Sequence, residues 1–474
     1  MEESKEIKMN RMGTERVPTL LLKTAFPMIF SMIVSALYNI VDSIFIGMME
    51  APLNEKAITA LGYAFPLQML LVAVAIGTGI GVNAVLSKAL GQRKNIEAAG
   101  ACVNGYLLMI AFYLLFLAFG LAILFGGFYF SAVTTDEMVA SMGAKYLGIC
   151  FIFSFGQLLQ LVSERSLCAT GKTTLAMVMQ LSGAITNIAL DPLFILTWNM
   201  GVEGAAIATI IGQMVSMVVG FLLMKFANKE IAIRKKDIRF DFSSMKKILH
   251  VGFPSIILQA IQSLQPLVFQ LVFMSLYHDS GATQDMLVAV YGVYYKLQNF
   301  VFMALYGLVN AMLPLVAFNY GSGNEKRAKQ AALYGYLYGL VIALIGIIVF
   351  EAMPKELLLL FRLNEEWVDT GVTLTRLIAP TFLLASLCVV SNGVLQGYGN
   401  GIHPMVITAL RLLVILFPAS FLFGYLFGMD AIWWGSYLAE GIAVMYALLF
   451  TYFVSKKKSA ESNQKQSSFA KKNV

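Results

Sequence analysis

Two carboxylates stand in stretches of this sequence that carry almost no other charge. Asp42 is the only charged residue between Thr24 and Met49, and Asp191 follows Asn187 by four residues in the run GAITNIALDPLFIL. Residues spaced i and i+4 share one face of a helix, so this amide and this carboxylate should lie together. Two carboxylates close together in an apolar medium cannot both stay ionised without a counter-ion. They therefore either hold a proton or coordinate a monovalent cation.

The two carboxylates are expected at the same depth. Asp42 comes 19 residues after Lys23, and Asp191 comes 19 residues after Lys172. Each lysine marks the start of an apolar run. At about 1.5 Å of rise per residue, both carboxylates should lie roughly 28 Å along their helices. A common depth is what a joint binding site requires.

Further polar residues complete the expected site. Thr209 follows Gly201 by about eight residues in a helix that enters from the opposite side, which brings it to the same level. Tyr38 and Asn39, about one turn before the first carboxylate, add a hydroxyl and an amide. Pro192 removes a backbone donor and frees a helical carbonyl, which suits a bend or a cation ligand. The expected cation site consists of Asp42, Asn187, Asp191 and Thr209.

A purely structural role is the alternative for these acids. They would then pair with Asn187 and Thr209 only to hold helices together. Neutral side chains would pack the same helices at lower cost than buried carboxylates, so we favour the ion site. The four Cys and three His fall at spacings that match no metal site. We expect no metal beyond Na⁺ at the cluster, and no cofactor.

The composition requires a membrane. The chain of 474 residues is 58% hydrophobic and 13% charged, with a mean hydropathy of +0.74, too apolar for a soluble protein of this length. Runs of about 20 apolar residues cross a bilayer as helices. We therefore predict an all-α polytopic membrane protein with twelve transmembrane helices. The expected spans are 20–48, 57–86, 98–126, 138–162, 173–198, 202–226, 247–276, 286–318, 328–352, 368–395, 403–427 and 430–455.

The distribution of basic residues predicts the orientation. Of the 34 Lys and Arg, 27 lie in or beside the two tails and every second loop, and only Lys56, Lys355 and Arg362 lie in the opposite loops. Basic loops stay in the cytoplasm, so both termini are expected there, in the cell membrane or bacterial inner membrane. The N-terminal tail 1–19 shows no cleavable signal. The basic tail 456–474 is predicted to be disordered. This topology accounts for the net charge of +7 without a nucleic-acid partner.

The chain repeats itself at an offset of 227 to 230 residues. Pro27 matches Pro254 at 227, and Gly91 matches Gly321 at 230. Further matches are Gly62 with Gly292, Gly171 with Gly399, and Gly201 with Gly428. Two copies of six helices have the same orientation, because six is even. We expect two pseudo-symmetric six-helix bundles, the usual plan of transporters that alternate access between two lobes. The expected parts are an N-lobe at 20–226, a linker at 227–246 and a C-lobe at 247–455.

The two copies differ in charge. The positions equivalent to Asp42 and Asp191 are Phe269 and Ala419, so the second copy lacks these acids. The intramembrane cations lie in the second copy and are Lys296, Arg376 and Arg411. Lys296 and Arg411 are the deeper ones, and Glu440 in the last helix is a candidate partner for them. Both cations and Gln262 are candidates for supporting or substrate-cavity residues.

With these motifs in place, the chain resembles the multidrug and toxic compound extrusion family. The likeness rests on TAFPMIFSMIVSALYNIVDSIFIG, NIALDPLFI, GVEGAAIAT and the ALGQRKN turn, and it extends from about Thr19 to Val454. It implies a V-shaped transporter that exports organic cations in exchange for H⁺ or Na⁺ by rocking its lobes. It also implies that the four residues of the expected cation site form the N-lobe ion site of the family. One branch uses a C-lobe acid where this chain has Gln262, so we expect coupling through the N-lobe alone.

The resemblance implies a working cycle and a set of partners. Ion binding at the two aspartates would reshape the first helix near Pro27 and lower the affinity for bound drug, with Pro27 and Pro192 as hinge candidates. The partners would be small organic cations and membrane lipid, and the protein would act as a monomer. The main alternative is a flippase for lipid-linked saccharides. A major-facilitator carrier fits the loops less well, and an enzyme is not expected because the loops offer no cluster of acids or His.

Overall fold

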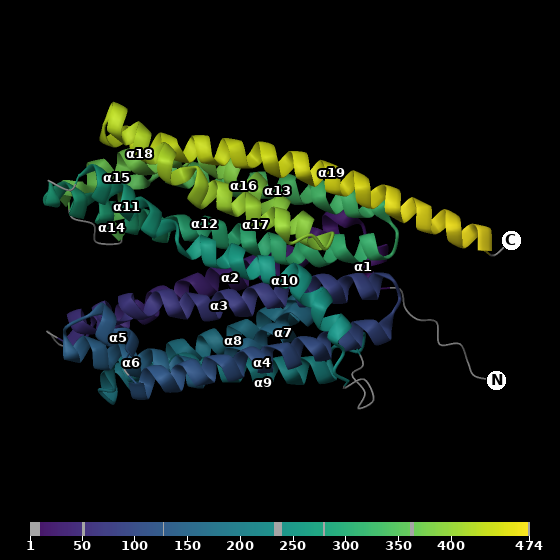
Figure 1. Ribbon diagram of the computed structural model, residues 1–474, viewed down its shortest axis with the longest axis horizontal. Helices are drawn as coiled ribbons and strands as arrows, with labels where there is room; N and C mark the ends of the chain where they lie inside the picture. The colour runs from purple at the N-terminus through teal and green to yellow at the C-terminus, as the bar shows by residue number, and fades with distance from the viewer. Residues whose placement is uncertain are drawn as a thin grey trace.

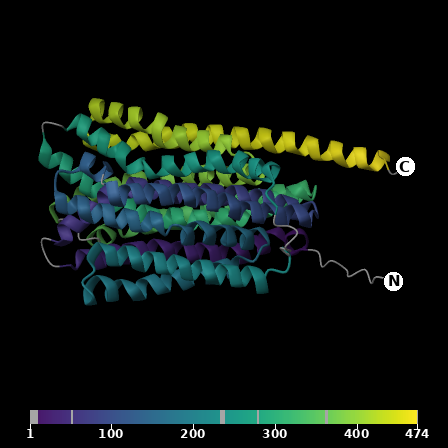
Figure 2. The same cartoon turned by 60° about the horizontal axis from the view of Figure 1, so that its bottom comes forward.

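The computed structural model describes residues 10–49, 53–126, 128–231, 239–277, 280–360 and 365–472. Within these ranges every regular element is a helix, and the long helices run side by side along one axis (Figures 1 and 2). Helices are the expected outcome, because a single span in lipid must satisfy its own backbone hydrogen bonds. The predicted all-α class is confirmed.

The first copy of the repeat forms one group of helices, the N-lobe. A short helix, α1 (Arg11–Thr14), precedes it. Its elements are α2 (Val17–Gly47), α3 (Leu53–Gly91), α4 (Asn95–Gly126), α5 (Phe128–Val133), α6 (Glu137–Ile152), α7 (Phe155–Ala169), α8 (Thr173–Asp191), the π-helix η1 (Pro192–Thr197) and α9 (Gly201–Phe226).

The second copy forms the C-lobe. Its helices follow the order of the N-lobe, with additional breaks in the spans that correspond to α2 and α8. Its elements are α10 (Phe242–Ser263), α11 (Gln265–Leu276), α12 (Gly281–Gly321), α13 (Glu325–Ala352), α14 (Pro354–Leu360), the 3-10 helix η3 (Glu365–Trp367), α15 (Val368–Ile378), α16 (Thr381–Gly397), α17 (Ile402–Ala409), the π-helix η4 (Leu410–Val414), α18 (Leu416–Phe427), the 3-10 helix η5 (Met429–Trp433) and α19 (Trp434–Lys472).

The number of spans depends on three bent helices. In the described ranges nine helices are long and apolar enough to cross a membrane by themselves, and three bent pairs bring the number to twelve. The pairs α6–α7 and α15–α16 bend by 45° and 53°, at positions that the repeat relates. The pair α10–α11 bends by 41°, whereas its N-lobe equivalent α2 is unbroken. Pro380 and Pro266 stand at two of these bends, where a missing N–H interrupts the helical ladder.

The two chain ends differ from the expectation. The first span starts at Val17 rather than at 20, behind the short helix α1. The segment from 456, predicted to be disordered, continues α19 as helix to Lys472 and projects beyond the other helices (Figure 1). No Pro or Gly follows Gly441, and Lys, Gln, Glu and Ala favour helix, so nothing in the sequence ends it earlier.

Among the described residues, the two lobes make close contacts at one end and towards the middle. We call that end the basal end; it carries both described chain ends and the turns at 92–94, 170–172, 322–324 and 398–401 (Figure 1). There, a Cβ atom added to Gly91 of α3 would lie 2.0 Å from the carbonyl oxygen of Phe318 in α12. Nearer the middle, one on Gly77 would lie 2.4 Å from the backbone nitrogen of Ile256 in α10.

The same helix faces are open at the opposite end. Gly62 precedes Gly91 by 29 residues, about eight helical turns, and so lies on the same face of α3. The repeat gives Gly292 and Gly321 the same spacing in α12. A Cβ atom on Gly62 or Gly292 would have no neighbour within 4 Å. The lobes therefore meet at the basal end and part towards the other end.

Candidate ion site and its surroundings

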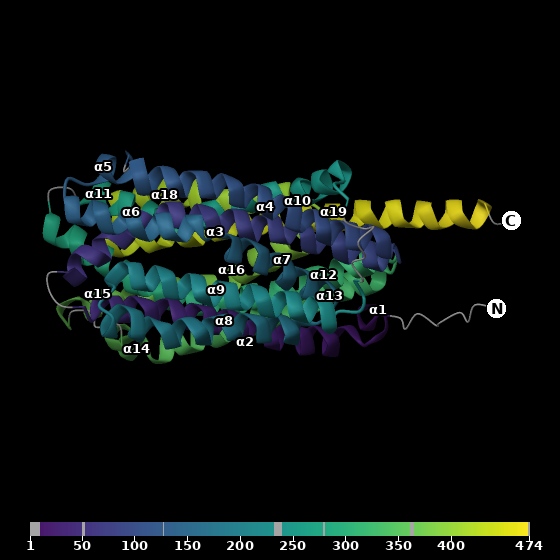
Figure 3. The ribbon, with the colours of Figure 1, turned by 90° about the horizontal axis from the view of Figure 1, so that it is seen from below.

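A hydrogen bond between α2 and α8 sets the register of the expected site. Ser31 of α2 donates to the side-chain oxygen of Gln180 in α8, and the two helices lie side by side (Figure 3). Both helices leave the basal end, and Asp42 and Asp191 each come 11 residues after this pair. Eleven residues are about three full turns, so each position returns to the face of its partner at the contact. The backbone thus places position 42 at the level of Asp191.

Asn187 and Asp191 form the described core of the site. Both side chains are buried, with 3% and 0% of their surface exposed. The amide nitrogen of Asn187 donates to Oδ1 of Asp191 over 3.2 Å, as their spacing on one helix face predicts. The Oδ1 atom of Asn187 is also buried, and it has no hydrogen-bond partner among the described residues. A buried amide oxygen without a donor suits a proton carrier or a cation ligand.

Close packing of α8 against α9 holds this pair in place. A Cβ atom on Gly212 of α9 would lie 2.7 Å from the carbonyl oxygen of Gly183 and 3.1 Å from the Cβ of Asn187. One on Gly204 would lie 2.9 Å from the carbonyl carbon of Phe194. Thr209 is half-buried and lies on α9 between Gly204 and Gly212, the two positions of close contact with the preceding helix. The two helices are antiparallel here, so Thr209 comes near the level of Asp191, as expected.

The two proline positions differ in their backbone. Pro192 begins the π-helix η1 directly after Asp191 ends α8. A π-helix is wider than an α-helix and occurs frequently at functional sites. Pro27 lies inside α2, which continues as one helix from Val17 to Gly47. The change from α-helix to π-helix therefore occurs directly after Asp191. The hinge roles of both prolines stay predictions.

Asp42 and the two supporting residues before it, Tyr38 and Asn39, belong to the described helix α2. Their side chains lie outside the described part of the structure. The structure therefore pairs Asn187 with Asp191 and places Thr209 and the backbone of residue 42 near their level. The joint binding of one ion by all four residues stays a prediction.

The C-lobe holds a buried ion pair in place of these acids. Arg411, in the π-helix η4, donates from Nε to Oε1 of Glu440 in α19, which confirms the suggested partner. Both residues are buried, and the guanidinium lies 5.0 Å from the ring centre of Phe302. A cavity of about 20 Å³ adjoins them, room for roughly one water molecule. The Oε2 of Glu440 and the hydroxyl of Tyr294, which also line it, have no hydrogen-bond partner among the described residues.

The repeat shows what this ion pair replaces. Arg411 stands at the position equivalent to Gly183, at an offset of 228, and Glu440 stands within one residue of the equivalent of Gly212. In the N-lobe these glycines let two helices touch, whereas in the C-lobe the corresponding helices are linked through two long charged side chains. The remaining C-lobe candidates lie outside this cavity. Lys296 is exposed on α12, and Gln262 is half-buried near the end of α10.

A second buried charge joins the lobes. Arg165, near the end of α7, is 3% exposed and donates from Nη1 to Oδ1 of Asn310 in α12 over 2.5 Å. Glu164 beside it is equally buried, with its Oε1 3.7 Å from Nη2 of Arg165. The Arg165–Asn310 hydrogen bond is therefore a direct link between the N-lobe and the C-lobe.

The glycine contacts of α8 and α9 were missed from the sequence. Gly212, Ser216 and Gly220 recur at every fourth position of α9, a small-residue pattern typical of close helix pairs in membranes. Ser216 donates to the carbonyl oxygen of Met179 in α8, and a Cβ atom on Gly220 would lie 2.5 Å from the Met179 sulfur. This spacing is the signal that would have identified the contact.

The chain matches known proteins over most of its length. The family model MatE matches twice, at residues 27–193 and 254–422, and the two matches start at the prolines that mark the repeat. The multidrug export protein MepA of Staphylococcus aureus strain MRSA252 is 23% identical over 453 residues, which cover 93% of this chain and 94% of that protein. MepA of Staphylococcus haemolyticus strain JCSC1435 is 23% identical over 428 residues, with 90% and 92% covered.

Solved structures share the fold. One, described as the outward-facing conformation of a multidrug resistance MATE family transporter of the MOP superfamily, superposes with a TM-score of 0.89 at 20% identity, covering 96% of this chain and 99% of that one. The twelve-helix architecture is therefore confirmed. Because the two MatE matches take in most of the chain and coincide with its two lobes, the chain belongs to the multidrug and toxic compound extrusion (MATE) family of membrane transporters.

Proposed function

We propose that this transporter exports drug-like organic cations in exchange for H⁺ or Na⁺, which it takes up at the N-lobe site of Asp42, Asn187, Asp191 and Thr209. The observation that carries the proposal is the buried Asn187–Asp191 pair, whose amide oxygen has no partner among the described residues. A buried ionised carboxylate in lipid is costly, and a proton or a monovalent cation removes that cost.

The proposed cycle uses the open and closed ends of the lobes. With the basal end in the cytoplasm, where its basic residues favour it, the open end faces outward. An ion entering from outside binds between α2 and α8, which changes their contact and releases the drug outward. The loaded protein then closes on the outside and opens at the base. Shifting such an equilibrium from 1:99 to 99:1 takes about 5.5 kcal/mol, within reach of one ion site.

The substrate class follows from the family and its relatives. The two staphylococcal relatives are named as multidrug export proteins, which supports drugs as the exported compounds and does not favour the saccharide–lipid flippase. Positive charge on the substrate is supported by the acidic N-lobe site. Membrane lipid and small organic cations are the proposed partners, and the protein is proposed to act as a monomer with both termini in the cytoplasm.

Transport in proteoliposomes tests the proposal. Efflux of a fluorescent organic cation is measured under a pH gradient and, separately, under a Na⁺ gradient, for the wild type and for Asp42→Asn and Asp191→Asn. Asp136→Asn serves as the matched control, because Asp136 lies outside the spans and pairs with Lys56. We expect one gradient to drive efflux, the two site variants to abolish it, and the control to retain it.

Each result has a defined meaning. The gradient that drives efflux identifies the coupling ion. If both site variants export as fast as the wild type, coupling does not use the N-lobe site. If neither gradient drives efflux in folded wild-type protein, organic-cation antiport is wrong and transbilayer movement of lipid-linked saccharides becomes the next assay.

A further inference from the structure

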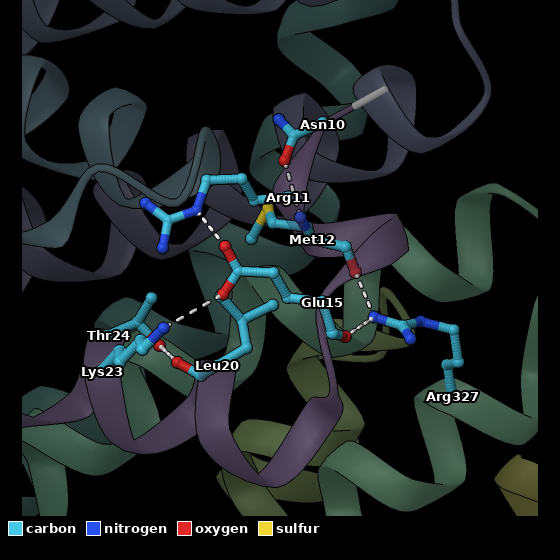
Figure 4. Close-up of polar contacts among 8 residues, drawn as sticks. All are labelled: Asn10, Arg11, Met12, Glu15, Leu20, Lys23, Thr24 and Arg327. Carbon is cyan, nitrogen blue, oxygen red and sulfur yellow. Dashed lines mark hydrogen bonds and ion pairs between the residues drawn. The ribbon is translucent and has the colours of Figure 1, made fainter. Parts of the chain in front are cut away.

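The chain segment before the first span lies across both lobes at the basal end. This strap, residues Asn10 to Glu15, includes α1 and ends just before α2 (Figure 4). Met12 is its buried centre, with 2% of its surface exposed. The strap is polar in sequence, so its burial depends on specific contacts rather than on the apolar periodicity that predicts spans.

On the C-lobe side the strap is held through its backbone. Nη2 of Arg327, in α13, donates to the carbonyl oxygens of Met12 over 3.0 Å and of Glu15 over 2.7 Å (Figure 4). Asn319 of α12, which is fully buried, donates to the same Met12 carbonyl over 3.1 Å and accepts from Nε of Arg327 over 3.1 Å. A Cβ atom on Gly13 would lie 3.3 Å from the ring of Phe318.

On the N-lobe side the strap is held by the Met12 side chain. Its Cγ would lie 3.3 Å from a Cβ atom on Gly171, in the turn between α7 and α8. Met12 also surrounds a gap too small for a water molecule, together with Cys168 and Thr173 of the N-lobe and Ala311 and Leu315 of the C-lobe. Asn10 donates to Glu230, where the chain leaves the N-lobe. One short segment thus contacts both lobes at the end where they meet.

The linker that precedes the C-lobe makes a corresponding contact with the N-lobe. Asn104 of α4 in the N-lobe donates to the carbonyl oxygen of Arg239 over 3.2 Å and accepts from the backbone N–H of Asp241 over 2.9 Å. The linker segment before the seventh span is therefore held on the N-lobe, as the strap before the first span is held on the C-lobe. By the repeat, Arg327 is equivalent to Glu97, so the cationic clamp on the strap has no counterpart at the equivalent position of the N-lobe.

We propose that Arg327 is a positioning residue of the transport cycle, which holds the strap across the closed basal end and stabilises the state that is open at the other end. The lobes cannot part at the base while Met12 stays bound to both, so either the two Arg327 hydrogen bonds or the Met12 contacts with the N-lobe must break before the base opens. Charge-assisted bonds to backbone carbonyls contribute more than neutral ones, which makes this clamp effective. The inference rests on the proposed alternating access.

Cys168 offers a native reporter for opening of the base. It is fully buried between the strap and the two lobes, with its sulfur 3.6 Å from that of Met28. Cys102 in the N-lobe and Cys388 in the C-lobe are equally buried. Faster labelling of these two cysteines would indicate that the packing within a lobe has weakened. Membranes containing the full chain are treated with N-ethylmaleimide, and the labelling rate of each cysteine is measured by mass spectrometry. The assay needs neither substrate nor ion gradient.

Arg327→Gln is the test variant, and Lys326→Gln is its matched control, because Lys326 is exposed next to it. We expect Arg327→Gln to raise the labelling rate of Cys168 about tenfold, the effect of losing roughly one charge-assisted hydrogen bond. Lys326→Gln is expected to leave the rate unchanged, and Arg327→Lys to restore part of the protection. Cys102 and Cys388 should label at wild-type rates in all variants.

A double variant tests whether Arg327 acts through the strap. Met12→Asp should also raise Cys168 labelling, and adding Arg327→Gln to it should have little further effect, because both changes release the same segment. Unchanged Cys168 labelling in Arg327→Gln overturns the inference, and so does an equal rise at all three cysteines or a fully additive double variant. Failed drug export with the expected labelling pattern would contradict the proposed function and leave the strap in place.

Discussion

Gly91 and Gly321, which the repeat places at equivalent positions, each pack against the turn of helix that precedes the other. A Cβ atom on Gly91 would lie 2.0 Å from the carbonyl oxygen of Phe318, and one on Gly321 would lie 2.3 Å from that of Lys88. Phe318 and Lys88 each stand three residues before a glycine of the pair. The contact is therefore reciprocal, and it closes the basal end about a pseudo-twofold axis.

Substituting either glycine should open the base. Gly91→Val or Gly321→Val would place a side chain inside the facing backbone, and such overpacking costs about 1–3 kcal/mol in the conformation that holds the contact. We expect a shift towards the base-open state, seen as faster maleimide labelling of Cys168. Gly62→Val and Gly292→Val are matched controls on the same helix faces, where a Cβ atom meets nothing within 4 Å. Equal labelling in both pairs would contradict a base closed by these glycines.

Gly212→Ala should weaken ion binding although both aspartates of the site are retained. The added methyl would lie 3.1 Å from the Cβ of Asn187 and 2.7 Å from the Gly183 carbonyl oxygen, so it must move Asn187 away from its present position. We expect a roughly tenfold higher ion concentration for half-maximal efflux, equivalent to about 1.4 kcal/mol. Gly441→Ala in α19, with nothing within 4 Å, is the control. An unchanged ion dependence in Gly212→Ala would separate Asn187 from the ion site.

The C-lobe ion pair should behave as a unit. Arg411→Met alone would leave the Glu440 carboxylate buried without its partner, and breaking a buried pair in this way costs about 3–5 kcal/mol. Arg411→Met with Glu440→Leu removes both charges and should recover most of that loss. Thermal unfolding of the purified protein in detergent measures both. If the double variant is as unstable as the single one, packing rather than the charge pair holds α19 against η4.

A pH-dependent contribution to stability is expected at the open end. Asp136 bonds to Lys56 over 2.9 Å and accepts from the backbone N–H groups of Met138 and Val139, and these contacts lower the pKa of its carboxyl. A carboxyl with a lowered pKa stabilises the fold above its unfolded pKa and loses that effect as the pH falls through the folded value. The unfolding temperature should therefore fall less below about pH 4 in Asp136→Asn than in the wild type. Identical pH profiles would contradict this.

Local signals in the sequence were enough for several features of the site. The depth argument from Lys23 and Lys172 agrees with the register set by Ser31 and Gln180, because both pairs of positions lie on helices that leave the same end. The bond from Asn187 to Asp191 follows from i, i+4 spacing alone. Such features depend on helix geometry, which one stretch of chain determines by itself.

Contacts between distant segments could not be derived in the same way. The sequence suggested Glu440 as a partner for Arg411 or Lys296, and only the packing of η4 against α19 decides for Arg411. It gave no sign that Arg327 would bind the backbone of the strap, because a backbone carbonyl carries no residue-specific signal. The helical continuation after residue 455 was also missed, since a charged, polar segment has no apolar pattern to indicate helix.

By itself, the sequence determined that this protein crosses a membrane as two copies of six helices, with two acids, Asp42 and Asp191, in apolar runs of the first copy. Long apolar runs in lipid must become helices, and a repeated pattern of helices must give a repeated lobe. Only the tertiary structure decided which end of the lobes is closed, which charges pair, and where the strap lies. Those outcomes depend on how side chains from separate helices fit together, as Gly91 and Gly321 do at the basal end.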